Sequence, residues 1–236
     1  MPKPRCTLIS LAATPYYHIV CRCVRRAFLC GEDSVTGRSF EHRRTWIQDR
    51  LFALAEIFAV DVCAYSATSN HYHLVLHIDR ETAESWTARE VIERWHELFA
   101  GNSLNQRYIN GADLIAAELT TVDTLVDLWH KRLMDISWFM RRMNESIARD
   151  ANVEDNCTGR FWEGRFKSQA LLDEAALMAC MAYIDLNPVR ASMAKTPEDS
   201  GFTSIQERSK KAKTAHTPNE KNQQPKRLMP PADHSR

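Results

Sequence analysis

The sequence predicts an α+β fold. Its ferredoxin-like core has the order β-α-β-β-α-β, with an added C-terminal helix that carries a tyrosine and an inserted helical segment. Short segments of high β propensity, separated by longer segments whose apolar residues recur at helical spacing, predict the core. A helix with defined ends, which contains Tyr183, follows the last predicted strand. A long interval of helical character at residues 80–124 predicts the insertion.

The individual elements follow from residue periodicity. Residues of high β propensity predict strands at 17–24, 60–65, 71–78 and 165–172. Apolar residues at helical spacing predict helices at 40–58 and 125–150, and shorter ones at 90–99 and 111–119 within the interval. The basic residues of the interval, Arg89, Arg94 and Arg107, do not cluster. The interval is therefore predicted to be an inserted helical segment with a structural role. The less favoured alternative is that it shapes a DNA-binding cleft.

Composition divides the chain into an N-terminal extension at 1–14, one domain at 15–206 and a tail at 207–236. The tail is rich in Lys, Pro, Gln and Asn and poor in apolar residues, which predicts disorder. Residues 208–236 contain eight Lys or Arg and two acidic residues, which gives a net charge of +6. Because the whole chain has a net charge of +1, the net charge of residues 1–207 is −5. The core thus lacks the strong basicity typical of nucleic-acid binders, and the tail either adds nonspecific DNA affinity or only aids solubility.

Cysteines and apolar segments indicate the compartment. The seven cysteines include no Cys-x-x-Cys pair, which predicts reduced thiols instead of disulfides or a zinc site. No segment approaches the roughly eighteen apolar residues of a membrane span. We expect a cytoplasmic protein with no membrane partner.

The strand predicted at 71–78 is the most informative segment because it places two imidazoles on one face. Side chains alternate along a strand, so His71 and His73 share a face, while Tyr72 and the leucines point to the other. Neutral imidazole is the commonest protein metal ligand, so the pair makes half of a metal site. The alternative is an ordinary solvated strand face, and His77 on that face is expected to be a solvated or core-edge residue.

A helix is predicted between Asp173, which suits its N-terminal cap, and Pro188, which disfavours helical geometry at the residue before it. Tyr183 and Asn187 lie one turn apart on a face with small alanines. A tyrosine hydroxyl attacks a phosphodiester well only where the developing charge is stabilised. A divalent ion on the two histidines, with Asn187 as an oxygen ligand, would supply this stabilisation. The alternative is a half-buried tyrosine with a hydrogen-bonded hydroxyl.

Three segments together form a specific combination: NHYHL at 70–74, GRFWEGRFKS at 159–168 and YIDLNPVRA at 183–191. In order and spacing they resemble the REP-associated tyrosine transposases, members of the HUH single-strand nucleases. The family is named for histidine, hydrophobic residue, histidine, and Tyr72 holds the middle position here. The resemblance covers roughly residues 15–80 and 128–206. It implies a ferredoxin-like fold, and the interval at 80–124 departs from the compact family pattern.

The resemblance also implies an activity. His71 and His73 would match the family's metal-binding pair, Tyr183 its nucleophile and Asn187 the polar ligand one turn later. Such enzymes use Mg²⁺ or Mn²⁺ to cut one DNA strand by transesterification, which leaves a 5′-phosphotyrosine linkage and a free 3′-hydroxyl. The implied partner is single-stranded DNA or hairpins of palindromic repeats, with the protein nucleoid-associated when bound. Family members differ in whether the tyrosine of one chain acts with the histidines of the same chain or with those of a partner chain. Both a monomer and a homodimer are therefore compatible with the resemblance.

The segment before the tyrosine helix combines cations with aromatic residues. Arg160, Arg165 and Lys167 are candidates to neutralise phosphates, and Trp162 is a candidate to stack on an unpaired base. At least one of the aromatic residues in this segment is expected to pack in the core instead. Further candidates for DNA contact are Arg22, Arg25, Arg26 and Arg190.

The sequence therefore predicts a metal-dependent endonuclease and strand transferase that cleaves hairpin-containing single-stranded DNA. The first alternative is a non-catalytic DNA- or RNA-binding protein that retains the fold. The second is a metal hydrolase in which an ion activates water and Tyr183 only positions the substrate. Covalent trapping on DNA separates these classes, because neither alternative forms a phosphotyrosine bond.

Overall fold

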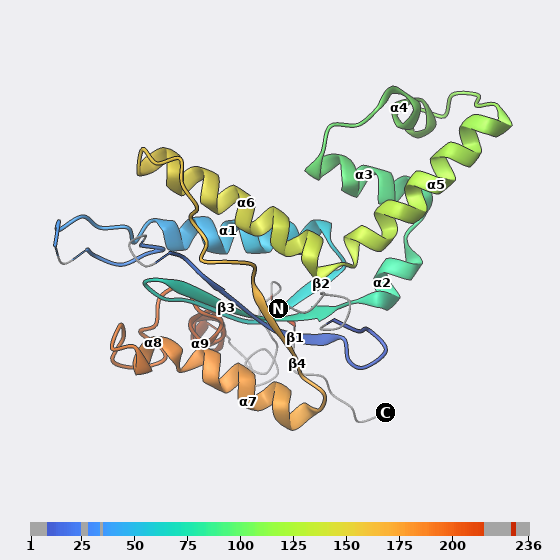
Figure 1. Cartoon of the computed structure of the whole chain (residues 1–236). Coiled ribbons are helices and arrows are strands. Elements are labelled where there is room, and N and C mark those ends of the chain that lie inside the picture. Colours follow the sequence, from blue (N-terminus) through green and yellow to red (C-terminus); the bar gives the residue numbers. More distant parts are fainter. Residues whose placement is uncertain (1–8, 25–27, 34, 215–227, 230–236) are drawn as a thin grey trace.

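The computed structural model describes residues 9–24, 28–33, 35–214 and 228–229, and its fold is mixed α+β (Figure 1). Its strands are β1 (Tyr16–Arg22), β2 (Val60–Ala67), β3 (His71–Ile78) and β4 (Lys167–Ala170). Its helices are α1 (Arg43–Ile57), α2 (Arg80–Ser85), α3 (Ala88–Leu98), α4 (Ser103–Ile109), α5 (Ala116–Leu133), α6 (Ile136–Glu154), α7 (Glu174–Asp185), α8 (Asn187–Arg190) and α9 (Ser204–Thr214).

The described strands form one antiparallel sheet in the order β2-β3-β1-β4, so β3 lies inside the sheet. β2 and β3 form a hairpin, and at its turn the Thr68 backbone N–H donates to the His71 carbonyl oxygen at 2.8 Å. Between β1 and β3 the register places Arg22 opposite His71 and Val20 opposite His73. Directly paired residues project to the same face of a sheet, so this register decides which side chains surround the histidines.

Helices cover both faces of the sheet (Figure 1). On one face, α1 and α6 contribute to the large core that buries the alternate β3 residues Tyr72, Leu74 and Leu76. On the other face, α7 packs against β2 and β3. The buried stripe of α7 consists of Leu177, Met181 and Ile184, as its helical spacing predicts. Burying one such side chain stabilises a fold by roughly 1.5–3 kcal/mol, so this stripe fixes the tyrosine helix on the histidine face.

The structure corrects the single helix predicted at 125–150. Two helices occupy this region, because α5 ends at Leu133 and α6 begins at Ile136. The Asp135 side chain caps α6 by accepting a hydrogen bond from the Ser137 backbone N–H. Leu133 and Ile136 are both fully buried. The apolar periodicity therefore continues across the break and conceals it in the sequence.

The helix predicted at 111–119 is wrong for residues 111–115, whereas residues 116–119 belong to α5. α4 ends before this segment, and Gly111 then adopts a left-handed conformation with φ of 70°. This conformation favours glycine and is typical of the residue that ends a helix. The next helix, α5, begins at Ala116, where the Glu118 side chain accepts from the Ile115 backbone N–H at 3.0 Å. The glycine thus ends one helix and does not begin another.

The remaining elements differ from prediction mainly at their ends. The helix predicted at 90–99 is α3, and the strand predicted at 165–172 is the shorter β4. Helix α9 occupies the first part of the tail predicted to be disordered. Residues 215–227 and 230–236, Arg25, Arg26 and residues 1–8 lie outside the described residues. The cysteines that the structure describes are free thiols, and no described helix is both long and apolar enough to cross a membrane.

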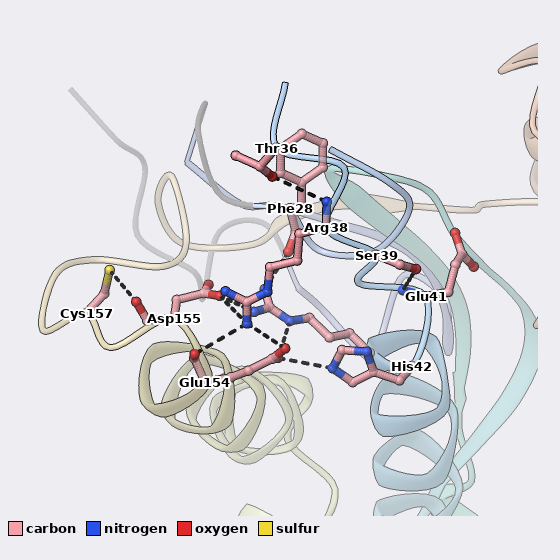
Figure 2. Close-up of polar contacts among 10 residues, drawn as sticks. Phe28, Thr36, Arg38, Ser39, Glu41, His42, Glu154, Asp155 and Cys157 are labelled. Atoms are coloured by element: carbon pink, nitrogen blue, oxygen red, sulfur yellow. Dashed lines mark hydrogen bonds and ion pairs between the residues drawn. The ribbon is translucent and has the colours of Figure 1, made fainter. Parts of the chain in front are cut away.

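An ion cluster joins the start of α1 to the end of α6 (Figure 2). The fully buried Arg43 side chain donates to Glu154 at 2.8 Å and to Asp155 at 2.5 Å. Arg38 and His42 approach the same Glu154 carboxylate at 2.9 and 3.1 Å. Burial raises the pKa of Glu154, but hydrogen bonds from Arg43, His42 and Arg38 outweigh burial and lower this pKa to about 2.

The stability of the fold should therefore depend on pH through Glu154. Its native pKa lies below its unfolded value, so its contribution is complete above about pH 5 and is lost as the pH falls toward about 2. We expect Glu154→Gln to lower the free energy of unfolding by about 1–2 kcal/mol near pH 7, because the side chain is partly exposed, and by much less near pH 2.5. Urea denaturation at the two pH values measures the difference.

Glu84→Gln is the matched control, because it removes only an exposed pair with Arg80 on α2. Exposed pairs contribute little, so this variant should unfold like the wild type at both pH values. If Glu154→Gln lowers the free energy of unfolding equally near pH 7 and near pH 2.5, the lowered pKa assigned to Glu154 is contradicted.

Candidate active site

The structure brings His71 and His73 together on one face of β3. Their ring centroids are 4.8 Å apart and their planes are inclined at 79°. Two imidazoles that bind one cation through nitrogens at about 2.1 Å have ring centres about 4.5–5.5 Å apart. The observed spacing therefore fits a shared cation.

The ring nitrogens of the pair differ in their partners. His71 Nδ1 contacts Asn70 Oδ1 at 2.7 Å and Thr68 Oγ1 at 3.0 Å. His73 Nδ1 contacts His18 Nε2 at 3.0 Å. His73 Nε2 is buried and has no hydrogen-bond partner among the described residues. Buried polar atoms are nearly always partnered, so this nitrogen has a lone pair or a proton left for a further contact.

Sequence analysis did not identify His18, which comes from β1. Its ring is nearly parallel to the His73 ring, with the centroids 5.2 Å apart and the two nitrogens in contact. The alternation along β1 places His18, Val20 and Arg22 on one face, but only the β1–β3 register shows that this face is the one with the histidine pair. A residue on the neighbouring strand β1 thus contacts the His73 ring nitrogen and helps to fix the orientation of that ring.

The environment keeps these imidazoles neutral. Burial, followed by the nearby His71, His18 and Arg22, lowers the pKa of His73 to about 3. Burial also lowers the pKa of His71, with a further contribution from Arg22, and burial alone lowers the pKa of His18. A neutral imidazole retains the lone pair that a metal requires. The neutral rings therefore keep the lone pairs that a metal ligand needs.

Tyr183 lies against the histidine pair. Its ring meets the His73 ring edge-on, with the centroids 5.7 Å apart, although the two residues come from distant segments of the chain. The Arg190 guanidinium carbon lies 5.5 Å from the centre of the tyrosine ring. The Tyr183 side chain is about 40% exposed, and its hydroxyl has no hydrogen-bond partner in the part of the chain that the structure describes. Tyr183 is therefore accessible from solvent.

Asn187 differs from its predicted position. The helix predicted between Asp173 and Pro188 does begin with an Asp173 cap, but α7 ends at Asp185, and Asn187 begins the separate helix α8. Asn187 is buried, and no described hydrogen bond joins it to either histidine. Within the described ranges, no three His, Cys, Asp or Glu side chains form a metal-binding group.

Helix α9 fastens the end of the tyrosine helix to the sheet. Asp185, the last residue of α7, accepts hydrogen bonds from Ser204 at 2.5 Å and from Arg208 at 3.1 Å. Arg208 also donates to the Cys63 carbonyl oxygen of β2. The anchor lies two positions after Tyr183 in the chain, so α9 helps to position the tyrosine. Sequence analysis missed the anchor because composition assigns Arg208 to the tail.

The predicted DNA-contacting residues divide into two groups. Arg165 and Lys167 line a cavity of about 400 Å³ that also includes Val20 and Arg22. Trp162 instead donates from its ring nitrogen to the Asn144 carbonyl oxygen at 2.9 Å, and its ring packs on the core residue Tyr72. We therefore do not include Trp162 among the proposed DNA-binding residues. Arg160 lines a different cavity, beside the buried Phe161.

A search of solved structures found a protein of similar fold, described as "Structure of the REP associates tyrosine transposase bound to a REP hairpin". The match has a TM-score of 0.52 and 12% sequence identity, and it covers 89% of this chain and 86% of that chain. At this identity the likeness shows the fold alone. No protein-family model and no curated protein sequence matches the chain.

Proposed function

We propose that the chain is a metal-dependent endonuclease and strand transferase for single-stranded and hairpin DNA, with Tyr183 as the nucleophile. The contact between Tyr183 and His73 carries the proposal, because segments more than a hundred residues apart meet there. The similar fold of a transposase bound to a hairpin supports a DNA-processing activity. The strand order β2-β3-β1-β4 supports a core of the ferredoxin-like type.

His71 and His73 would hold a divalent ion, which we propose to be Mg²⁺ or Mn²⁺. The unpartnered His73 Nε2 and the spacing of the two rings support this assignment. Asn187 is proposed as a further ligand, through its side-chain oxygen. The ion would act as a Lewis acid that polarises a phosphoryl oxygen. Arg190, beside the Tyr183 ring, would stabilise negative charge near the phenol oxygen.

In the proposed reaction, the Tyr183 hydroxyl oxygen attacks the phosphorus of one DNA linkage. A bond from this oxygen to phosphorus forms as the bond from phosphorus to the 3′ oxygen breaks. The phenol proton passes to solvent, which reaches the exposed ring, and the departing 3′ oxygen takes up a proton. No water is consumed, so a 3′-hydroxyl can later attack the phosphotyrosine and rejoin a strand.

Covalent trapping on end-labelled DNA tests the proposal. The full chain is incubated with a panel of hairpins that carry single-stranded flanks, in Mn²⁺, Mg²⁺ or EDTA, and is then denatured. Because the tyrosine would join the 5′ phosphate of the downstream fragment, we expect label from the 3′ end, and none from the 5′ end, to remain on the protein. This adduct should form with either metal and be absent in EDTA.

The other outcomes identify the alternative functions. DNA binding without an adduct across the panel would indicate a non-catalytic binding protein. Metal-dependent cutting without an adduct would indicate that water, and no side chain, is the nucleophile. Retention of 5′-end label would indicate the opposite polarity of attack and would contradict the proposed chemistry.

A further inference from the structure

A group of cations beside the histidine pair has no acidic partner. Arg22, Arg165 and Lys167 are exposed and line the cavity of about 400 Å³, together with Val20, Glu163 and Gly164. No ion pair or side-chain hydrogen bond is formed by any of the three with another described residue. Elsewhere, exposed arginines such as Arg89 on α3 pair with a nearby carboxylate. With Glu163 counted, the cavity carries a formal net charge of +2.

The strand register connects this cavity to the histidine pair. Arg22 lies directly opposite His71, and Val20 lies opposite His73 on one side and Lys167 on the other. Paired residues share a face, with Cβ atoms about 4.5–5.5 Å apart, so the cavity lies on the same face as the histidines.

This part of the sheet face is open. The tyrosine helix α7 makes most of its sheet contacts with β2 and β3, and β4 lies at the opposite edge of the sheet from β2. Figure 1 shows α7, α8 and α9 on this face of the sheet. Arg22, at the end of β1, and Lys167, at the start of β4, remain exposed. The end of this face at Arg22 and Lys167 is therefore accessible to a DNA strand.

We propose that Arg22, Arg165 and Lys167 bind the DNA backbone phosphates next to the linkage that Tyr183 attacks, with Arg22 nearest to the histidine pair. The position relative to the attacked linkage rests on the proposed function, whereas the phosphate site itself does not require cleavage. A guanidinium matches two phosphate oxygens at once, and unpaired cations in a concave site lose no partner when a phosphate enters. The phosphate backbone is the same in every DNA sequence, so these contacts would not depend on the base sequence.

Binding measurements in EDTA test the site without cleavage. The probe is a fluorescently labelled single-stranded oligonucleotide, and its anisotropy gives Kd over a series of salt concentrations. We expect Arg22→Ala to raise Kd roughly five- to tenfold at low salt and to reduce the slope of log K against log salt by about 0.7, the value for one phosphate contact on single strands. Arg22→Lys should retain the slope, because it retains the charge.

Arg89→Ala is the matched control, because Arg89 is equally exposed but lies on α3 and pairs with Glu93. It should leave both Kd and slope unchanged. Circular dichroism and thermal melting verify that each variant is folded. The proposal is wrong if Arg22→Ala binds like the wild type, or if Arg89→Ala weakens binding as much, since the effect would then reflect overall charge.

Adduct formation separates the phosphate site from the proposed function. Normal adduct formation by Arg22→Ala with unchanged binding would refute the site and leave the function intact. Weakened binding by Arg22→Ala, with no adduct from the wild type, would support the site and refute the function. Where an adduct forms, a neutral methylphosphonate next to the mapped linkage should slow the wild type and have a much smaller effect on Arg22→Ala. Equal slowing of both proteins would place the Arg22 contact elsewhere on the strand.

Discussion

Substitution of Tyr183 by Phe is expected to abolish the covalent DNA adduct and to leave DNA binding and stability intact. The variant lacks the oxygen that would attack phosphorus, so the labelled protein band should fall to background, a loss of at least about a thousandfold. The phenyl ring retains the edge-on contact with His73. The Tyr183 hydroxyl has no described hydrogen bond to lose, so the free energy of unfolding should change by less than about 0.5 kcal/mol.

Tyr16→Phe is the matched control for this experiment. Tyr16 is also a tyrosine that packs against a histidine, since its ring centroid lies 4.7 Å from that of His77. It is buried away from the histidine pair, so the variant should form the adduct at the wild-type rate. Persistence of the adduct in Tyr183→Phe would show that another side chain is the nucleophile. Persistence of cutting without an adduct would assign the attack to water.

The second large effect is expected for His71→Ala. His71 is only half-buried, so its removal should leave the fold intact while removing one of the two proposed imidazole ligands. A ligand of a catalytic ion contributes several kcal/mol to transition-state stabilisation, so adduct formation should slow by about a hundredfold or more. Mn²⁺ binding, measured by electron paramagnetic resonance in the absence of DNA, should weaken in parallel and provides a readout that does not depend on activity.

His77→Ala tests whether metal binding and adduct formation depend specifically on the pair of His71 and His73. His77 lies on the same strand and face as His71, but its Nδ1 contacts Asp61 at 2.9 Å. This variant should bind Mn²⁺ and form the adduct within a few-fold of the wild type. Unchanged Mn²⁺ binding in His71→Ala, or equal losses in the two variants, would remove the support for a metal site at the pair.

Local sequence patterns predicted the parts of the site that depend on a single element. The period of two along β3 placed His71 and His73 on one face because alternation is a property of the strand itself. The helical spacing of Leu177, Met181 and Ile184 likewise predicted the buried side of α7, and the structure confirms it. Asp173 was predicted as a cap and accepts from the Ala176 backbone N–H at 2.7 Å.

Contacts between elements could not be predicted in this way. His18 reaches His73, and Arg22 lies opposite His71, only through the β1–β3 register, which joins residues far apart in the chain. Asn187 was misplaced because α7 ends at Asp185, where α9 anchors it. The sequence does not show this anchor, because it depends on Ser204 and Arg208 folding back onto the end of α7.

The contact between Tyr183 and His73 occurs within a single chain. On the proposed function, this contact would place the nucleophile and the metal-binding pair of one chain at the same DNA linkage, so the rate per molecule should not change on dilution. An inactive copy in the same cell would not impair an active one, except by occupying its DNA.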